Sequence, residues 1–379
     1  MNLKPFLLDE WLNKNHFSDP PISYDLASST GAAWTLAEFM ALLDDAERER
    51  LKEMPLLYTP NEGTGELRSA LAGMHGVDPK QVQVTTGAAE ALFILFFLAA
   101  EPGANVVLPF PGFPPFHEVP GSLGIETRFY RLRRENGFQI DPDEIKQLAD
   151  SNTKLILVNS PHNPTGAVLD ASALNAVHDF AAARGITFVV DEVYHPIYYG
   201  AAAGSAEKLP HATVVSDFSK AFCLSGLRIG WIVERDRRRI EQYCRARSYF
   251  TVSNSPLTES LAVAAVLHRD KIFARASRVA GANLMLLDEF FARHQDVLGW
   301  IRPAGGMTAF PWMIDGSDSR RFCEGLAERG VLLAPGDCFG IPDHFRLGFG
   351  AAAQGFDRAL ETVAEFARGY FASARTTGA

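Results

Sequence analysis

Apolar residues follow two alternating patterns along the central part of the chain, from about residue 80 to residue 235. Short runs rich in β-branched residues, which are typical of strands, lie between segments where apolar residues recur every three or four positions, as in helices. The strand-like runs cover 81–86, 104–110, 125–132, 153–160, 186–194, 212–218 and 228–233. Several, such as 153–160, lack polar alternation, which is typical of strands buried on both faces of a parallel sheet. The pattern therefore predicts an α/β fold with a large domain whose mostly parallel sheet is covered by helices.

The pattern changes after about residue 256. A long helical segment at 271–295 is followed by short strand-like runs that alternate with further helical segments. The first 30 or so residues have no sheet partner of their own, so we expect them to pack on this later part. We therefore predict an N-terminal segment (1–45), a large domain (46–270) and a smaller α+β domain built from 271–379 together with the N-terminal segment.

Composition and charge narrow the classes of protein to which the chain can belong. The 379 residues are enough for two domains with sizeable cores, and a net charge of -9 argues against nucleic acid or an anionic membrane surface as the partner. The longest uncharged apolar stretch, 91–100, is shorter than the roughly 20 residues of a membrane helix, so it predicts a buried helix. Four cysteines without disulfide or metal spacing favour a reducing compartment, with the cytoplasm as the default location.

Polar and glycine-rich motifs stand where the predicted strands end. In parallel α/β sheets ligands bind beyond the carboxyl ends of the strands, so these positions are candidates for a ligand site. The motifs are TTGAAEA (85–91), PFPGFPPF (109–116), NSPHNPTG (159–166), DEVY (191–194) and SDFSK (216–220), with Arg228 just beyond. Each motif alone has a plain structural explanation as a helix cap, a turn or a loop aromatic. Together they predict one site at this edge of the sheet.

In their order and spacing these motifs resemble the fold type I pyridoxal-phosphate enzymes, in particular the class I/II aminotransferase family, over about residues 55–350. The most specific is the family's S-K-x(7)-R-x-G signature, which stands here as Ser219, Lys220, Arg228 and Gly230. GGMTAF (305–310), PGDCFG (335–340) and FRLGFG (345–350) follow in family order. The resemblance implies pyridoxal 5'-phosphate as cofactor and a homodimer with shared active sites.

The resemblance implies a catalytic role for three residues. Lys220 would anchor the cofactor aldehyde as a Schiff base and, once freed by an amino acid, would move the α-proton. Asp191 would face the pyridine nitrogen and keep it protonated, so that the ring can accept electrons. Tyr194 and Asn163 would hydrogen-bond to the ring hydroxyl oxygen. Taken alone, Lys220 could be a surface lysine in a turn and Asn163 a turn initiator.

The cofactor phosphate needs backbone donors and a cation. Gly87, Ala88 and Ala89 open an apolar helix whose N–H groups provide such donors, and Arg228 supplies a guanidinium. The resemblance assigns a further hydroxyl contact to Ser219.

Four further residues complete the predicted cofactor and substrate contacts. The resemblance implies that Tyr58 reaches the phosphate of a neighbouring subunit and that Phe113 stacks on the pyridine ring. It also implies that Arg346 pairs with the substrate α-carboxylate, with Asn163 and Thr30 as further substrate contacts. Their plain alternatives are a loop aromatic for Phe113 and a structural ion pair for Arg346.

Three features depart from the commoner family pattern. Asp217 stands where a serine often touches the phosphate, and a carboxylate there would repel an anion unless it turns away or pairs with a cation. The N-terminal loop at 25–34 carries extra hydroxyls at Ser28, Ser29 and Thr30. The motif PGFPP stands where the family more often has proline-x-tyrosine, so Phe113 provides an aromatic ring without a phenol hydroxyl.

Two other kinds of site are poorly supported. GTGELR (63–68) begins like a dinucleotide fingerprint, but Arg68 stands where the third glycine should be and no strand leads into the motif. His162, His178, His195 and His211 do not fall at metal-ligand spacing with cysteines or paired carboxylates. The sequence therefore argues against a dehydrogenase and against a metal centre.

Three functions fit the sequence. An aminotransferase that moves an amino group between an L-amino acid and a 2-oxo acid fits best. A lyase, cyclase or decarboxylase of the same fold is the alternative, because one carbanion can collapse along several routes. The stretch LDEWLNKNHF and the residues after it also resemble the start of the capreomycidine synthases, cyclising members of this fold, over about 35 residues. A non-catalytic cofactor-binding regulator is remote, since no DNA-binding helix pair or basic stripe precedes residue 50.

Overall fold

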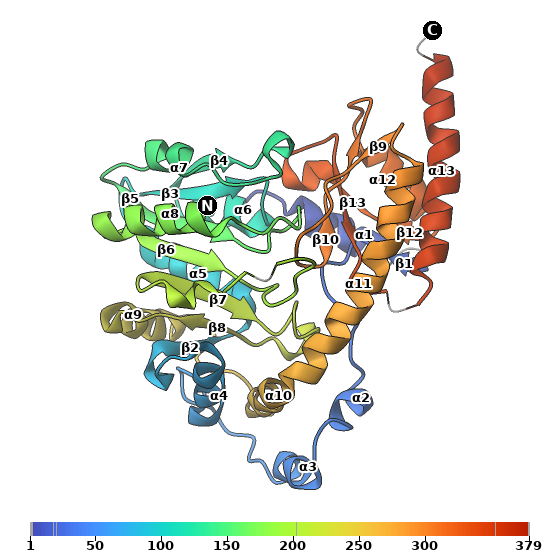
Figure 1. Cartoon of the computed structure of the whole chain (residues 1–379). Helices are drawn as coiled ribbons and strands as arrows, with labels where there is room; N and C mark the ends of the chain where they lie inside the picture. Colours follow the sequence, from blue (N-terminus) through green and yellow to red (C-terminus); the bar gives the residue numbers. More distant parts are fainter. Residues whose placement is uncertain (1–2, 18, 20, 202, 353, 378–379) are drawn as a thin grey trace.

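A seven-stranded sheet forms the centre of the larger part of the molecule (Figure 1). The structure is a computed structural model that describes residues 3–17, 19, 21–201, 203–352 and 354–377. The strand order is β2-β8-β7-β6-β5-β3-β4. The strands are β2 Val82–Thr85, β3 Asn105–Phe110, β4 Glu126–Arg131, β5 Thr153–Asn159, β6 Thr187–Asp191, β7 Ala212–Asp217 and β8 Gly230–Val233.

The sheet is mostly parallel, as predicted. Strands β4, β3, β5, β6 and β7 pair in parallel, and β8 runs antiparallel to both β7 and β2. Every residue of β7 and all but one of β5 are buried, which explains their lack of polar alternation. The strand predicted at 186–194 ends earlier, at Asp191. There the Oδ1 of Asp191 accepts a hydrogen bond from the N–H of Val193, and this local turn takes the chain out of the sheet.

Helices cover both faces of the sheet. Helix α8 (Ala171–Arg184) crosses the front in Figure 1, and α5 (Gly87–Ala99) lies behind the strands. The apolar stretch 91–100 falls within α5 and its end, and most of its residues are buried, so the prediction of a buried helix is confirmed. The other helices of this part are α4 Gly65–His75, α6 Pro114–Ser122, α7 Pro142–Leu148, α9 Arg237–Arg247 and α10 Pro256–Leu267.

The smaller part begins with the long helix α11 (Arg269–Arg293), which runs diagonally between the two parts in Figure 1. It contains α12 (Arg320–Ala327), α13 (Phe356–Thr377) and short sheets. One sheet has the order β10-β14-β13, and another pairs β11 with β9. These strands are β9 Leu298–Gly299, β10 Thr308–Ala309, β11 Trp312–Met313, β12 Val331–Leu332, β13 Ala334–Pro335 and β14 Phe345–Gly348.

The N-terminal segment packs on this smaller part, as predicted. Strand β1 (Tyr24–Asp25) pairs in parallel with β12, and the indole N–H of Trp11 in α1 (Leu7–His16) donates to Leu333 O at 2.8 Å. Two short helices, α2 (Leu36–Met40) and α3 (Asp45–Lys52), then lead to the larger part. The exact domain boundaries at residues 45 and 270 stay predictions. Within the described ranges, no helix has both the length and the apolar character that crossing a membrane requires.

Candidate active site

The carboxyl ends of β5, β6 and β7 lie side by side and begin the site. Asn159 ends β5 opposite Asp191, which ends β6. The side-chain amide of Asn159 donates to Asp191 O at 2.9 Å, and its Oδ1 accepts the N–H of Asn163 at 2.8 Å. Asn159 therefore fixes the loop that carries Asn163. This role was not predicted. The available signal was that Asn159, the first residue of the NSPHNPTG motif, is a polar residue at the end of a predicted strand.

Three predicted catalytic residues lie in this region with altered acidities. Burial is the main cause that raises the pKa of the Asp191 carboxyl to about 7; the hydrogen bond from Val193 opposes this shift, and the nearby Asp217 carboxylate adds to it. Burial lowers the pKa of the Lys220 amine to about 8 and raises that of the Tyr194 phenol to about 12. A carboxyl and an amine that both titrate near neutral pH are typical of sites that move protons.

A hydrogen-bonded set joins these residues to the smaller part. The Nζ of Lys220 lies 2.8 Å from the Oγ of Ser29, and the Tyr194 hydroxyl donates to Ser29 O at 2.9 Å. Arg346 on β14 is buried and donates to Ala27 O at 2.7 Å and to the Oδ1 of Asn163 at 3.3 Å.

One donor of this set is unused. The Nε of Arg346 is buried and has no hydrogen-bond partner among the described residues. A buried guanidinium N–H without a partner is costly, so this donor is suited to an anionic ligand. Thr30 lies in the same loop, where its hydroxyl bonds to that of Ser28 at 2.9 Å.

The predicted phosphate contacts meet where α5 approaches β8. Gly87 opens α5 with a φ of 73°, and a Cβ there would lie 2.7 Å from Nη2 of Arg228. A Cβ on Gly230 would lie 2.4 Å from the carbonyl carbon of Gly87. The two glycines therefore allow a helix N-terminus, a strand and a guanidinium to come together, which is a suitable arrangement for an anion. Arg228 also donates to Ser225 O at 3.1 Å.

Asp217 takes part in this end of the site. Its carboxylate accepts the hydroxyl of Ser219 at 2.7 Å, the N–H of Ser219 at 2.8 Å and the N–H of Ala88 at 3.4 Å. In this structure two of the predicted phosphate donors therefore serve Asp217. The carboxylate is held by neutral donors, so a bound phosphate would compete with it for Ser219 and Ala88. Ala89, in the same first turn of α5, is exposed.

Two predicted contacts have no hydrogen bond or ring contact with this set among the described residues. Tyr58 is 91% exposed, in the segment that joins α3 to α4. Phe113 precedes α6, and its ring packs edge to face on Phe116 with centroids 5.7 Å apart. The roles assigned to both residues stay predictions.

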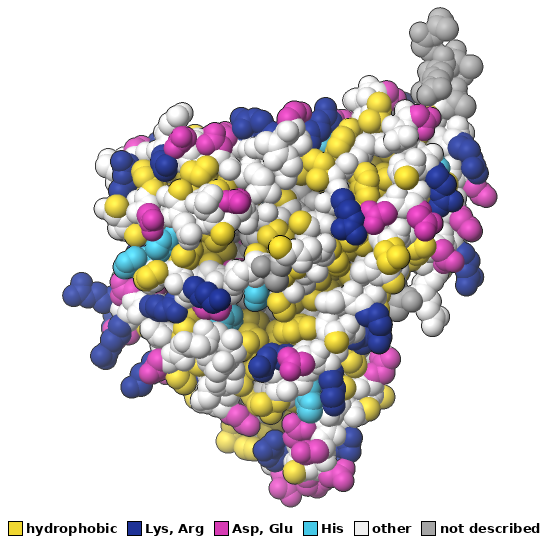
Figure 2. Space-filling view, viewed as in Figure 1, with side chains coloured by type: hydrophobic (Ala, Val, Ile, Leu, Met, Phe, Trp, Pro, Cys, Tyr) yellow, Lys and Arg dark blue, Asp and Glu magenta, His cyan; other side chains and the backbone are white. Residues whose placement is uncertain are grey.

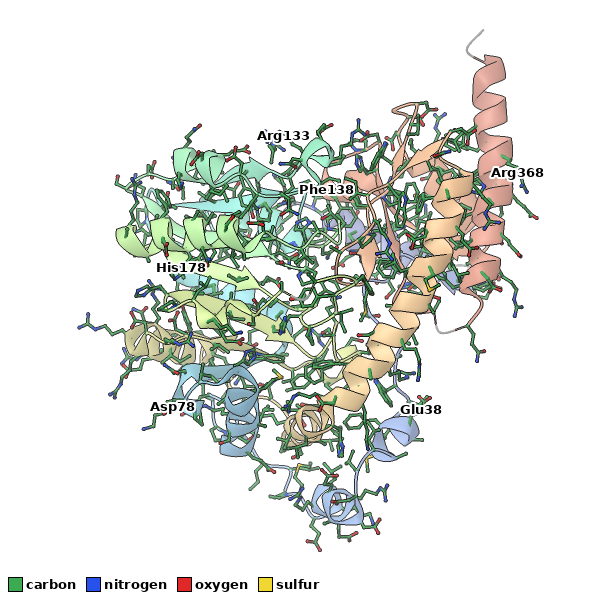
Figure 3. All side chains as sticks on the ribbon, in the orientation of Figure 1. Glu38, Asp78, Arg133, Phe138, His178 and Arg368 are labelled. Atoms are coloured by element: carbon green, nitrogen blue, oxygen red, sulfur yellow. The ribbon has the colours of Figure 1, made fainter. Side chains whose placement is uncertain are left out.

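The described residues contain no cluster of three or more His, Cys, Asp or Glu side chains that could hold a metal ion. His178 lies on α8, as Figure 3 shows, and bonds to the neighbouring Asp179 at 2.8 Å. His195 bonds to the hydroxyl of Tyr198 at 2.8 Å. These histidines have structural partners instead of metal-ligand neighbours.

Comparison with known proteins shows the family to which this chain belongs. The family model described as aminotransferase class I and II matches residues 28–363. Capreomycidine synthase from Streptomyces vinaceus is 32% identical over 365 residues, which are 94% of this chain and 92% of that protein. The chain belongs to the class I and II aminotransferase family, whose members use pyridoxal phosphate.

Two solved structures show the same fold over almost the full length. A PLP-dependent aminotransferase from Streptococcus suis superposes with a TM-score of 0.90 at 29% identity, covering 97% of this chain and 98% of that one. The PLP-dependent cyclase OrfR superposes with a TM-score of 0.87 at 29% identity, covering 98% of both chains. Similar backbones therefore occur in proteins named for two different reactions.

Proposed function

We propose that this protein is a pyridoxal-phosphate-dependent aminotransferase that moves an amino group between an L-amino acid and a 2-oxo acid. The observation that carries this proposal is that the half-buried Lys220 and the buried Tyr194 and Arg346 all hydrogen-bond to one loop beside the carboxyl of Asp191. An amine, a carboxyl and a guanidinium in this arrangement match the needs of amino acid chemistry, because they bind a carboxylate and move a proton.

The residues fit the cofactor that the family uses. Lys220 would hold its aldehyde carbon, Asp191 its ring nitrogen, and Arg228 with the first turn of α5 its phosphate. When bound, the cofactor supplies an aldehyde that bonds to amines and a ring that accepts the electron pair left at the substrate Cα. The close approach of Arg228 to Gly87, which a Cβ would prevent, supports the phosphate end. Of the residues named at this phosphate end, Asp217 alone carries a negative charge, so it favours a ligand less negative than phosphate.

The protein's own groups then have defined tasks. The Lys220 amine has a pKa of about 8, so a substantial fraction is neutral at slightly alkaline pH and can take a proton from the substrate Cα. Arg346 would bind the substrate carboxylate through its unused Nε–H and a neighbouring N–H. A cation against Asp191 would favour the charged form of its carboxyl, which burial disfavours.

We also propose that the chain works as a homodimer with shared active sites. Tyr58 is almost fully exposed, and its neighbours Leu56 and Leu57 are 79% and 70% exposed. Figure 2 shows hydrophobic side chains gathered along the segment between α3 and α4. Exposed apolar side chains in a row favour a covering partner, and a second copy would bring Tyr58 to the phosphate end of its site.

A cytoplasmic location is part of the same proposal. The four cysteines are free, and Cys223, Cys323 and Cys338 among them are buried. Free cysteines are typical of a reducing compartment.

A lyase or cyclase is the second candidate. Its support is the 32% identity to capreomycidine synthase along nearly the whole chain, together with the likeness to the cyclase OrfR. The residues that hold the cofactor suit either reaction, because both begin with loss of a proton from the substrate Cα.

The test is a product analysis of the purified protein loaded with pyridoxal phosphate and given single L-amino acids. We expect pyridoxamine phosphate together with the matching 2-oxo acid. Ammonia, carbon dioxide or a cyclised product, with the cofactor returned to its starting form, would instead assign a lyase, decarboxylase or cyclase.

The control is Lys220→Ala. In the wild type, borohydride should fix the cofactor covalently to the peptide that contains Lys220, and mass spectrometry detects this. The variant should lose the fixed cofactor and at least a thousandfold of its activity, in line with the loss of a covalent anchor and a proton carrier. A wild-type protein that fixes no cofactor at Lys220 would overturn the proposal.

A further inference from the structure

The loop of residues 26–31, called here the hydroxyl loop, crosses from the smaller part to the catalytic lysine. It leaves β1 and carries Ser28, Ser29 and Thr30. The hydroxyl of Ser29 lies 2.8 Å from Lys220 Nζ. This is a contact between residues 191 positions apart, so it depends on how the N-terminal segment is held against the sheet.

Backbone contacts hold the hydroxyl loop on both sides of Ser29. The N–H of Gly348 donates to Leu26 O at 2.6 Å, and Arg346 donates to Ala27 O at 2.7 Å. From the sheet, the Tyr194 hydroxyl donates to the carbonyl of Ser29 itself at 2.9 Å. Ser29 is therefore positioned from the smaller part and from the sheet at once.

The loop also fits too closely to shift easily. A Cβ on Gly348 would lie 1.7 Å from Ser28 O, and one on Gly31 would lie 2.2 Å from the Sγ of Cys223. Before the loop, Oδ1 of Asp25 accepts the N–H groups of Ala27 and Ser28 at 2.9 and 3.0 Å. A side chain on such a fixed backbone has few alternative positions.

Only one of the three hydroxyls faces the lysine. The hydroxyls of Ser28 and Thr30 bond to each other at 2.9 Å. Ser29 Oγ is the sole hydrogen-bond partner of Lys220 Nζ within the described part of the chain, and Nζ is likewise the sole partner of that Oγ. Within the described chain, the hydrogen bond of the Lys220 amine therefore depends on the Ser29 hydroxyl.

Charged groups of both signs surround the Lys220 amine. Two carboxylates favour its ammonium form and two guanidinium groups oppose it: Asp217, Asp191, Arg346 and Arg228. The carboxylates and the guanidinium groups act on the amine in opposite directions. A single direct hydrogen bond can therefore determine the position of the amine and shift its pKa.

We propose that Ser29 is a positioning residue for the reaction, whose hydroxyl docks the Lys220 amine in the state in which that amine is free to take up or release a proton. This inference rests on the proposed function. It adds a residue of the N-terminal loop to the proton-handling group of the site.

The proposal predicts the direction in which the pKa of Lys220 changes when the Ser29 hydroxyl is removed. A hydrogen bond from an ammonium to a hydroxyl is roughly twice as strong as one from a neutral amine. Removing the Ser29 hydroxyl therefore costs the ammonium form more than the neutral form, and the pKa of Lys220 should fall. The freed amine should also sample more orientations, which slows proton transfer.

The experiment compares Ser29→Ala with Ser29→Thr, which keeps a hydroxyl, and with Ser28→Ala, which removes the neighbouring hydroxyl of the same loop. The full-length proteins, freed of cofactor, are acetylated with limiting acetic anhydride across a pH series. Mass spectrometry of the peptide that contains Lys220 then gives the midpoint of amine reactivity. We expect a midpoint lower by roughly half to one pH unit in Ser29→Ala, with the wild-type midpoint in Ser29→Thr and Ser28→Ala.

A kinetic measurement on the loaded enzymes adds a second readout. The kcat of Ser29→Ala should fall about tenfold with little change in KM, because the amine is misplaced while Arg346 is untouched. Ser29→Thr should restore most of this loss.

The outcomes separate this inference from the proposed function. A wild type that fixes no cofactor on Lys220 would overturn the proposed function. A wild type that fixes it, with an unchanged midpoint in Ser29→Ala, would overturn the role of Ser29 alone. An equal shift in Ser28→Ala would also overturn that role, since it would show an effect of the loop backbone. Circular dichroism of each variant confirms that the chains compared are folded.

Discussion

Asp191 shows how a single buried residue ties stability to function. Its side chain is almost fully buried and, in the described chain, accepts one hydrogen bond, from the N–H of Val193. Burial raises the pKa of this carboxyl to about 7, from an ordinary value of 3.8 in the unfolded chain. Between about pH 4 and pH 7 the folded state therefore holds a proton that the unfolded state has lost, so this group lowers stability as the pH rises.

The cofactor-free Asp191→Asn variant should therefore be more stable than the wild type at pH 8, by about 2 to 4 kcal/mol, and by clearly less at pH 5. Urea denaturation of both proteins at the two pH values measures this gap. The same substitution should weaken cofactor binding, because the partner of the ring nitrogen loses its charge.

Asp270→Asn is the matched control for Asp191→Asn, because the Asp270 side chain is 95% exposed. Its effect on the free energy of unfolding should be small at both pH values. An Asp191→Asn gap of equal size at pH 5 and pH 8 would contradict the assigned titration.

At the residue scale, the strand-end rule predicted that Asp191, Tyr194 and Lys220 lie together, because a parallel sheet brings successive carboxyl ends to one edge. It did not predict the contact between Ser29 and Lys220. That contact depends on the N-terminal loop docking on β14, more than 300 residues further along the chain. The sequence marks Ser29 only as one of three neighbouring hydroxyls, and nothing local says which of them faces inward.

At the element scale, the contact of α5 with β8 sets the shape of the predicted phosphate end. Gly230 begins β8, and its Cα lies so close to the start of α5 that a Cβ would come within 2.4 Å of Gly87. Backbone atoms on the other side cannot rotate away, so any side chain here would push the helix from the strand.

Gly230→Ala should therefore weaken the binding of pyridoxal phosphate by about tenfold or more and destabilise the protein by about 1 to 3 kcal/mol. Fluorescence titration with the cofactor and urea denaturation measure the two effects. Gly226→Ala, in the turn just before, is the matched control, because a Cβ there meets nothing within 4 Å. Equal cofactor affinity in both variants would show that α5 does not depend on this contact.

Strand positions were predictable from the sequence because the buried strands carry continuous β-branched runs, as in β5 and β7. The end of β6 was placed three residues too late. Val193 and Tyr194 resume the apolar and aromatic pattern after Asp191 and Glu192, but the side chain of Asp191 closes a turn that the pattern of apolar residues does not reveal.

At the scale of the whole molecule, an exposed apolar segment favours a second copy. Leu56, Leu57 and Tyr58 point away from their own chain's core. Tyr249 and Phe250 are 80% and 37% exposed and follow Arg247, which hydrogen-bonds to Asn61 O near the end of this segment. The composition alone could not predict this surface, because exposed and buried leucines look alike in a sequence.

Leu57→Asp should therefore shift the protein from dimer to monomer in light scattering at micromolar concentration and weaken cofactor binding, because Tyr58 would leave the neighbouring site. Met285→Asp on α11 is the matched control, since Met285 is 66% exposed and lies outside the segment. A wild type that is monomeric, or a Leu57→Asp variant that stays dimeric, would contradict the shared site.

The pairing of β1 with β12 has a consequence for the order in which the protein is completed during its synthesis. Tyr24 and Asp25 emerge early from the ribosome, but their partners Val331 and Leu332 emerge about 300 residues later. The sheet from β2 to β8 has all its strands by residue 233 and can assemble first. We therefore expect the sheet around Lys220 to be able to form before Arg346, which holds the loop of Ser29, has been synthesised, so the proposed site can be completed only near the end of translation.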